Sequence, residues 1–91
     1  MDINLEREKQ SIAEELDAIS KKVPDLKKKN DPVLLKYNME LALKRLTQLY
    51  YLNFYHLEKS PADPETKKIA KDELLTEYRM EMIKWAVLFK Q

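Results

Sequence analysis

Few residues in this sequence are of a type and at a spacing that could do chemistry. His56 is the single histidine. The carboxylate-bridged metal sites of helical bundles place a glutamate three residues before the histidine, where this chain has Asn53. A zinc site would need further ligands from elsewhere, and the chain has no cysteine to supply them. We therefore predict that the protein has no metal site and no cofactor.

The carboxylates and hydroxyls form no catalytic pair. Glu73, Glu77 and Glu81 follow one another at intervals of four residues, which is typical of the solvated face of a helix. No base that could activate a hydroxyl accompanies the three serines, which are Ser11, Ser20 and Ser60. We predict that the chain has no catalytic residue and is not an enzyme.

Four polar residues lie on an otherwise apolar arc between the second and third prolines of the chain. They are Asn38, Arg45, Asn53 and His56. Burying each of them without a partner would cost on the order of 1 to 3 kcal/mol. One interpretation is that they lie at the rim of the core or make hydrogen bonds within it. The alternative is that they line a polar small-molecule pocket between helices.

Apolar periodicity and helix-start signals predict three helices that position these residues. The first should span about residues 3–22 and end where Pro24 interrupts the backbone hydrogen bonds. Asp-Pro pairs then predict helix starts at Pro32 and Pro64, because aspartate caps the free N–H groups and proline fits the first turn. We expect the second helix over about 32–59 and the third over about 64–90.

The predicted fold is an all-α, antiparallel three-helix bundle that forms a single domain over residues 1–91. Short connections make successive helices antiparallel neighbours. The sequence has 91 residues and no glycine, which disfavours β-hairpins and phosphate-binding loops together. Apolar residues are 44% of the chain, enough for one modest core.

The third predicted helix carries two apolar stripes. We assign the first stripe to the core, and it consists of Leu74, Leu75, Tyr78, Met82, Trp85, Ala86 and Phe89. The second stripe lies on the opposite side of the helix, and it consists of Ile69, Thr76, Met80, Ile83 and Val87. Because a helix of a three-helix bundle needs one buried face, the second stripe indicates a surface that contacts a partner.

Tyrosines form a further strip on the second predicted helix. Tyr37, Tyr51 and Tyr55 lie at the edge of its polar face. They are either boundary residues or part of a binding surface, where rigid amphipathic rings are favoured. We include them with the second stripe as candidate partner-binding residues.

Charge and hydropathy exclude two classes of partner. Seventeen basic and sixteen acidic residues leave a net charge of +1, and we therefore expect no binding to nucleic acid. The longest apolar run, Trp85–Phe89, is far shorter than the about 20 residues of a membrane span. We expect a soluble protein without a membrane partner, cytoplasmic if it is expressed in a cell.

The connecting segments and overall composition carry a resemblance. The chain lacks glycine and cysteine, starts two helices with Asp-Pro, and has the segment Ser-Pro-Ala-Asp-Pro-Glu-Thr-Lys-Lys at 60–68. These features resemble those of de novo designed helical-bundle mini-proteins. Asn38, Asn53, His56 and four methionines depart from that style. The alternative is a small natural helical regulatory protein.

These observations lead to three hypotheses about function. The first is a non-enzymatic protein-binding or scaffold module that presents the second stripe of the third helix to another polypeptide. The second is a structural homo-oligomer in which this stripe meets a second copy of the chain. The third is a small-molecule receptor that uses Asn38, Arg45, Asn53 and His56.

Overall fold

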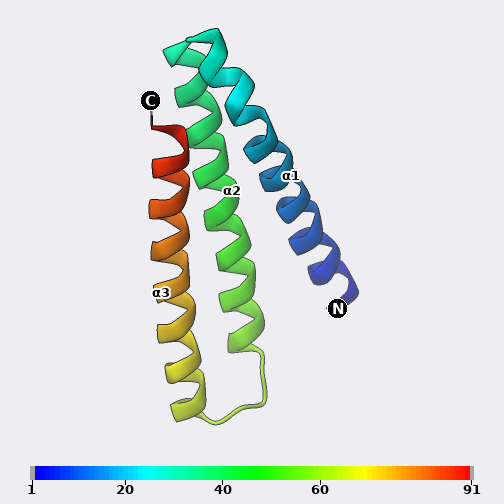
Figure 1. Ribbon diagram of the computed structural model, residues 1–91. Coiled ribbons are helices and arrows are strands. Elements are labelled where there is room, and N and C mark those ends of the chain that lie inside the picture. Colours follow the sequence, from blue (N-terminus) through cyan, green and yellow to red (C-terminus); the bar gives the residue numbers. More distant parts are fainter. Residues whose placement is uncertain (1, 91) are drawn as a thin grey trace.

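A computed structural model describes residues 2–90, and within them the chain forms three α-helices (Figure 1). They are α1 (Asp2–Lys29), α2 (Pro32–Glu58) and α3 (Pro64–Phe89). Successive helices run in opposite directions, and α2 lies between the other two. The prediction of an all-α, antiparallel three-helix bundle is confirmed.

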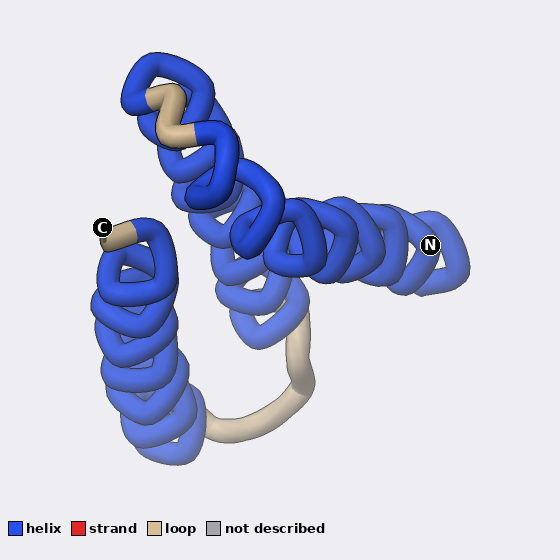
Figure 2. Tube along the Cα trace, turned by 45° about the horizontal axis from the view of Figure 1, so that its top comes forward, coloured by secondary structure: helices blue, strands red, loops and turns tan. Residues whose placement is uncertain are grey.

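The predicted end of the first helix was wrong, because α1 continues through Pro24 to Lys29. Pro24 is exposed and removes one backbone hydrogen bond, but the residues on either side of it hold the helix in place. Val23 is 2% exposed and Leu26 is 6% exposed, so tertiary packing continues past the proline. Figure 2 shows that the axis of α1 bends on its way to α2, and a proline inside a helix is the usual cause of such a bend.

Two short connections reverse the chain without glycine. At the first, Asn30 takes the left-handed conformation, with φ of 53°, and its N–H donates to the Lys27 carbonyl. Asp31 then caps α2 by accepting hydrogen bonds from the N–H groups of Val33 and Leu34, each at 3.1 Å. These caps satisfy backbone groups that the helix ends leave unpaired.

The second connection uses the other predicted start signal. The carboxylate of Asp63 accepts a hydrogen bond of 2.8 Å from the Thr66 N–H at the first turn of α3. Hydrogen bonding from Thr66 holds the pKa of Asp63 below its ordinary value, because it stabilises the ionised carboxylate. Both Asp-Pro pairs therefore act as the sequence predicts.

The buried core is concentrated at the end of the bundle where α1 meets α2. Its apolar members are Leu16, Ile19, Val23 and Leu26 of α1, Leu35, Ala42 and Leu46 of α2, and Trp85 and Phe89 of α3. The rings of Trp85 and Phe89 stack with their centroids 6.2 Å apart. Leu75 and Ala86 were predicted as core residues but are exposed, because they lie at the edge of the buried face of α3.

Farther from this core, the molecule reduces to a hairpin of α2 and α3. Thr47 and Tyr78 share a hydroxyl hydrogen bond of 2.7 Å, and the rings of Tyr50 and Tyr78 lie 5.3 Å apart. Near the connecting loop, the Lys71 ammonium pairs with the Glu58 carboxylate. These contacts keep α2 and α3 side by side between the core and the connecting loop (Figures 1 and 2).

The amino-terminal half of α1 turns away from this hairpin (Figures 1 and 2). The radius of gyration is 15.5 Å, whereas a compact chain of this length would have about 12 Å. The molecule is accordingly elongated, with extents of 50 × 25 × 15 Å. Leu5 and Ile12 of α1 are half-buried, in contrast to Leu16, Ile19 and Val23 farther along the same helix.

Candidate functional site

The outward face of α3 carries an uncovered row of side chains. We call it the α3 seam, and it consists of Ile69, Thr76, Met80, Ile83 and Val87. Its four apolar members are 56 to 65% exposed. The structure therefore places all five predicted residues on the surface, along one line of the helix.

The seam is separate from the face by which α3 joins the bundle. Trp85 and Phe89 are 8% and 5% exposed on that inner face, and Tyr78 meets α2 there. At 100° per residue, the seam lies on the side of α3 opposite these aromatic residues. Figure 1 shows α3 at an edge of the molecule, with no other helix beyond it. The fold thus uses one apolar face of α3 and leaves the other uncovered.

Charged residues border the α3 seam on both sides. Asp72 and Arg79 lie along one edge, and Glu73, Glu77 and Lys84 lie along the other. Lys84 approaches Glu81 at 3.8 Å, which is a loose contact between exposed groups. An apolar centre with a charged border is the general anatomy of a protein interface.

The tyrosine strip faces solvent from α2. Tyr37, Tyr51 and Tyr55 are 62, 69 and 50% exposed. Tyr55 lies beneath the Lys59 ammonium, which is 5.5 Å from the ring centroid. Tyr51 and Tyr55 also border a hollow with Lys71, on the side of α3 away from the seam. The tyrosine strip and the α3 seam are therefore two separate surfaces that face different directions.

Two of the four polar residues predicted for a pocket make contacts within the bundle. Asn38 is buried, and its amide Nδ2 donates to the Leu34 carbonyl at 2.9 Å. The Arg45 guanidinium bridges α2 to α1 by a hydrogen bond of 2.6 Å from Nε to the Glu15 carboxylate. It also donates to Gln48 on its own helix at 2.8 Å. These bonds favour the interpretation that both residues are structural.

The other two polar residues lie toward the far end of α2. Asn53 is half-buried and His56 is exposed. The four side chains are spread over about five helical turns, roughly 27 Å along the helix axis, so they do not converge on one point. Among the residues with described side chains, no three histidines or carboxylates are grouped as they would be around a metal ion.

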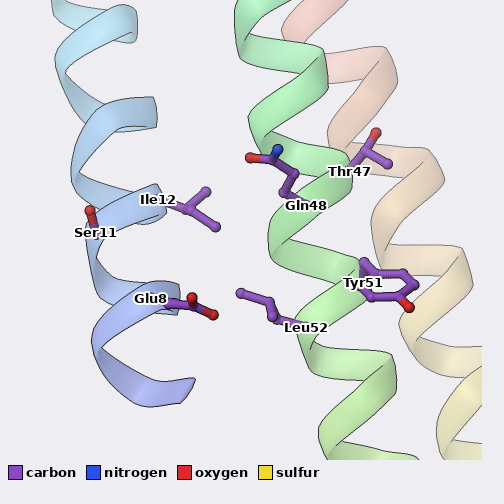
Figure 3. Close-up of a pocket in the computed structure, with 7 residues that line it drawn as sticks. All are labelled: Glu8, Ser11, Ile12, Thr47, Gln48, Tyr51 and Leu52. Carbon is purple, nitrogen blue, oxygen red and sulfur yellow. The ribbon is translucent and has the colours of Figure 1, made fainter. Parts of the chain in front are cut away.

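A groove that the sequence patterns did not predict lies between α1 and α2, where α1 begins to diverge. Its volume is about 490 Å³. Figure 3 shows Glu8 and Ile12 pointing from α1 toward α2, with Gln48 and Leu52 pointing back from α2. Its lining consists of Glu8, Ser11, Ile12, Thr47, Gln48, Tyr51 and Leu52. It contains a carboxylate and hydroxyls without a basic side chain, and Tyr51 is its one member from the predicted sites.

Tyr50 is the aromatic residue with a shifted pKa in the α2–α3 hairpin. Burial raises its pKa, and the nearby carboxylates of Glu77 and Glu81 raise it further. A raised pKa keeps the phenol protonated at neutral pH. This is the opposite of what a tyrosine nucleophile or base requires, and it suits the packing of Tyr50 against Tyr78.

Comparisons with known proteins identify no relative of this chain. No protein-family model, curated protein or solved structure matches the chain. Among residues 2–90, the helices are all too polar to cross a membrane. The function must therefore be inferred from the surface of the molecule itself.

Proposed function

We propose that the protein is a non-enzymatic protein-binding module that presents the α3 seam to another polypeptide. The observation that carries the proposal is the exposure of Ile69, Met80, Ile83 and Val87 on the side of α3 opposite its buried aromatic residues. Isolated exposed apolar residues are common on protein surfaces. A row of them at helical spacing is typical of a helix that packs against a second helix.

The binding would come from apolar burial, with no chemical step. Met80 and Ile83, each 65% exposed, lie at the middle of the seam and would be its central anchors. Methionine adapts its side chain to different neighbours, which suits a contact surface. Because α3 is already folded against α2, binding would not have to offset the entropy of forming the helix.

The test replaces the two central anchors with charges. The variant M80E/I83E puts two carboxylates at the middle of the seam. The matched control A13E/V33E adds the same charge at exposed positions of α1 and α2. Circular dichroism and thermal unfolding should be the same for both variants, since all four residues are exposed.

Amphipathic helical peptides selected from a displayed library against the wild-type chain provide the binding readout. We expect them to bind the wild type and A13E/V33E with equal affinity. Binding to M80E/I83E should be weaker by about 30-fold or more, the effect of losing a central anchor. The proposal would be wrong if the selected peptides bound M80E/I83E as tightly as the wild type.

A further inference from the structure

We propose that the groove between α1 and α2, the α1–α2 groove, binds a small organic cation and that Glu8 pairs with it. The ligand is a guanidinium group carried on an apolar body. This site lies apart from the α3 seam, so the inference goes beyond the proposed function. The groove has a volume of about 490 Å³, and sites for small molecules are typically about 300–1,000 Å³.

An ion pair next to the groove sets the register of α1 against α2. Arg45 Nε donates to the Glu15 carboxylate at 2.6 Å, so these two residues lie opposite each other. Because the helices are antiparallel, seven residues back along α1 correspond to seven residues forward along α2. This step of two turns leads from Glu15 to Glu8 and from Arg45 to Leu52. Both residues line the groove, and Figure 3 shows their side chains pointing toward each other.

Glu8 therefore repeats the carboxylate of the first pair without its cation. Where α2 presents Arg45 to Glu15, it presents the apolar Leu52 to Glu8. Among the ion pairs of the described residues, none includes Glu8. A guanidinium supplied by a ligand would take the place that Arg45 takes two turns away. Its planar fork matches a carboxylate through two parallel hydrogen bonds, which a lysine-like ammonium cannot make.

The basic residues nearest the groove are held elsewhere or lie outside it. Arg45 also donates to Gln48 at 2.8 Å, so two partners fix its guanidinium. Lys9 pairs with Glu6 at 3.2 Å. Lys44 is exposed on α2, one turn before Gln48 and outside the lining. The lining contains a single charged side chain, which is a carboxylate, and charge complementarity therefore favours a cationic ligand.

Apolar side chains provide the rest of the contact. Ile12 and Leu52 are half-buried, and Figure 3 shows both pointing into the space between the helices. An apolar body placed there would cover them, while the charged head stays at the exposed Glu8. The lining covers little more than one turn of each helix, roughly 6 to 8 Å. That length suits a compact molecule and is too short for a helix of several turns.

A matched pair of probes tests the charge of the ligand. The cation is 2-phenylethylguanidinium, and its neutral analogue of the same shape is 2-phenylethylurea. In a ¹H–¹⁵N NMR titration of the wild-type chain, we expect the cation to bind with a Kd of about 2 mM, typical of its size. The largest shifts should fall on amides of residues 8–12 and 47–52. The urea should bind at least about fivefold more weakly, because it cannot pair with a carboxylate.

A charge-removing variant tests the role of Glu8. E8Q keeps the size of the side chain and should weaken binding of the cation by about fivefold or more. The matched control E14Q makes the same change at an exposed position on another side of α1 and should bind as the wild type does. Circular dichroism should be the same for all three proteins. The inference is overturned if E8Q retains wild-type affinity, if cation and urea bind equally, or if the cation does not bind up to about 20 mM.

Leu52→Arg tests the register without any ligand. The new guanidinium should pair with Glu8 as Arg45 pairs with Glu15. Adding E8Q should therefore raise the equilibrium constant for unfolding of L52R by about twofold to fivefold more than it raises that of the wild type. The matched control L52M should show no such coupling. Absence of coupling in L52R would mean that Glu8 does not face this position, and would overturn the inference. The peptide assay with M80E/I83E decides the proposed function separately, because it concerns a different surface.

Discussion

Asn30 shows how a chain without glycine ends a helix. A left-handed residue commonly follows a helix end, and glycine is the usual choice because it has no Cβ. Asn30 takes this conformation with φ of 53°. Asparagine tolerates the left-handed region better than other residues with a Cβ, because its short polar side chain can bond locally. The first connection therefore depends on the identity of this residue.

Substitution at Asn30 should change stability in a direction set by the backbone. We expect N30G to raise the free energy of unfolding by up to about 0.5 kcal/mol and N30A to lower it by about 1 kcal/mol. Urea unfolding followed by the fluorescence of Trp85, the single tryptophan, measures both. Equal stability of N30G and N30A would show that the left-handed conformation is not required.

Asp63 makes the stability of the folded chain depend on pH in the acid range. Its pKa in the folded chain is lowered from the ordinary value of 3.8 by hydrogen bonds from Thr66. A lowered pKa means that the ionised form stabilises the folded state. This contribution is present above pH 3.8 and is lost as the pH falls through the folded pKa.

The variant D63N keeps a capping oxygen but cannot ionise. We expect its stability to fall less than that of the wild type between pH 6 and pH 2. Urea unfolding at several pH values measures the difference. Parallel pH profiles for the two proteins would contradict this account of the cap.

Residue-scale features differ in how far the sequence predicts them. The Asp-Pro pairs are local signals, and both caps form as expected because they need only their own first turn. The contact of Arg45 with Glu15 joins residues thirty positions apart, and no spacing rule predicts it. The same holds for the hydroxyl pair of Thr47 and Tyr78.

At the scale of the helix, α1 shows why a proline is a weak stop signal. The loss of one hydrogen bond is a local cost, whereas Val23 and Leu26 bury side chains in the core on both sides of Pro24. Sequence pattern alone gives no measure of that packing. The start signals of α2 and α3 were predictable because no tertiary contact opposes them.

The two faces of α3 should respond differently to truncation. F89A should lower the free energy of unfolding by about 3 kcal/mol, because Phe89 is 5% exposed and stacks on Trp85. V87A should change it by less than about 0.5 kcal/mol, because Val87 is 62% exposed.

Thermal or urea unfolding at low micromolar concentration makes the comparison. A loss with V87A as large as that with F89A would mean that the seam is part of the core of one chain. The two variants remove neighbouring apolar groups of the same helix, so each serves as the control for the other.

At the scale of the whole molecule, we expect the protection of backbone amides from hydrogen exchange to follow the uneven distribution of buried residues along the chain. The residues that are at most 8% exposed lie between positions 16 and 46 and at positions 85 and 89. Residues 4–15 of α1 and the α2–α3 connection bury no side chain to that extent. Hydrogen exchange should therefore be slowest near the core and at least about tenfold faster in those two regions.

Mass spectrometry of exchanged peptides measures this gradient. Peptides that cover Leu16–Leu26 should stay protected longest, and peptides that cover 4–12 should exchange early. Uniform protection along α1 would contradict the structure, in which the amino-terminal half of α1 turns away from the α2–α3 hairpin. Helical periodicity predicts which face of α1 is apolar. The divergence of α1 from α2 depends instead on how the three helices share a small core, and the sequence of one helix does not determine that.

The last core contact of α1, at Leu16, makes the amino-terminal half of this helix a lever arm. About 21 Å of helix extends from Leu16 to the amino-terminal end of α1, so a rotation of roughly 10° at Leu16 moves that end by about 4 Å. The α1–α2 groove lies on this arm, and its width therefore changes with the angle of the arm. A small adjustment in the best-packed part of the molecule is thus amplified into a large displacement at its least-packed end.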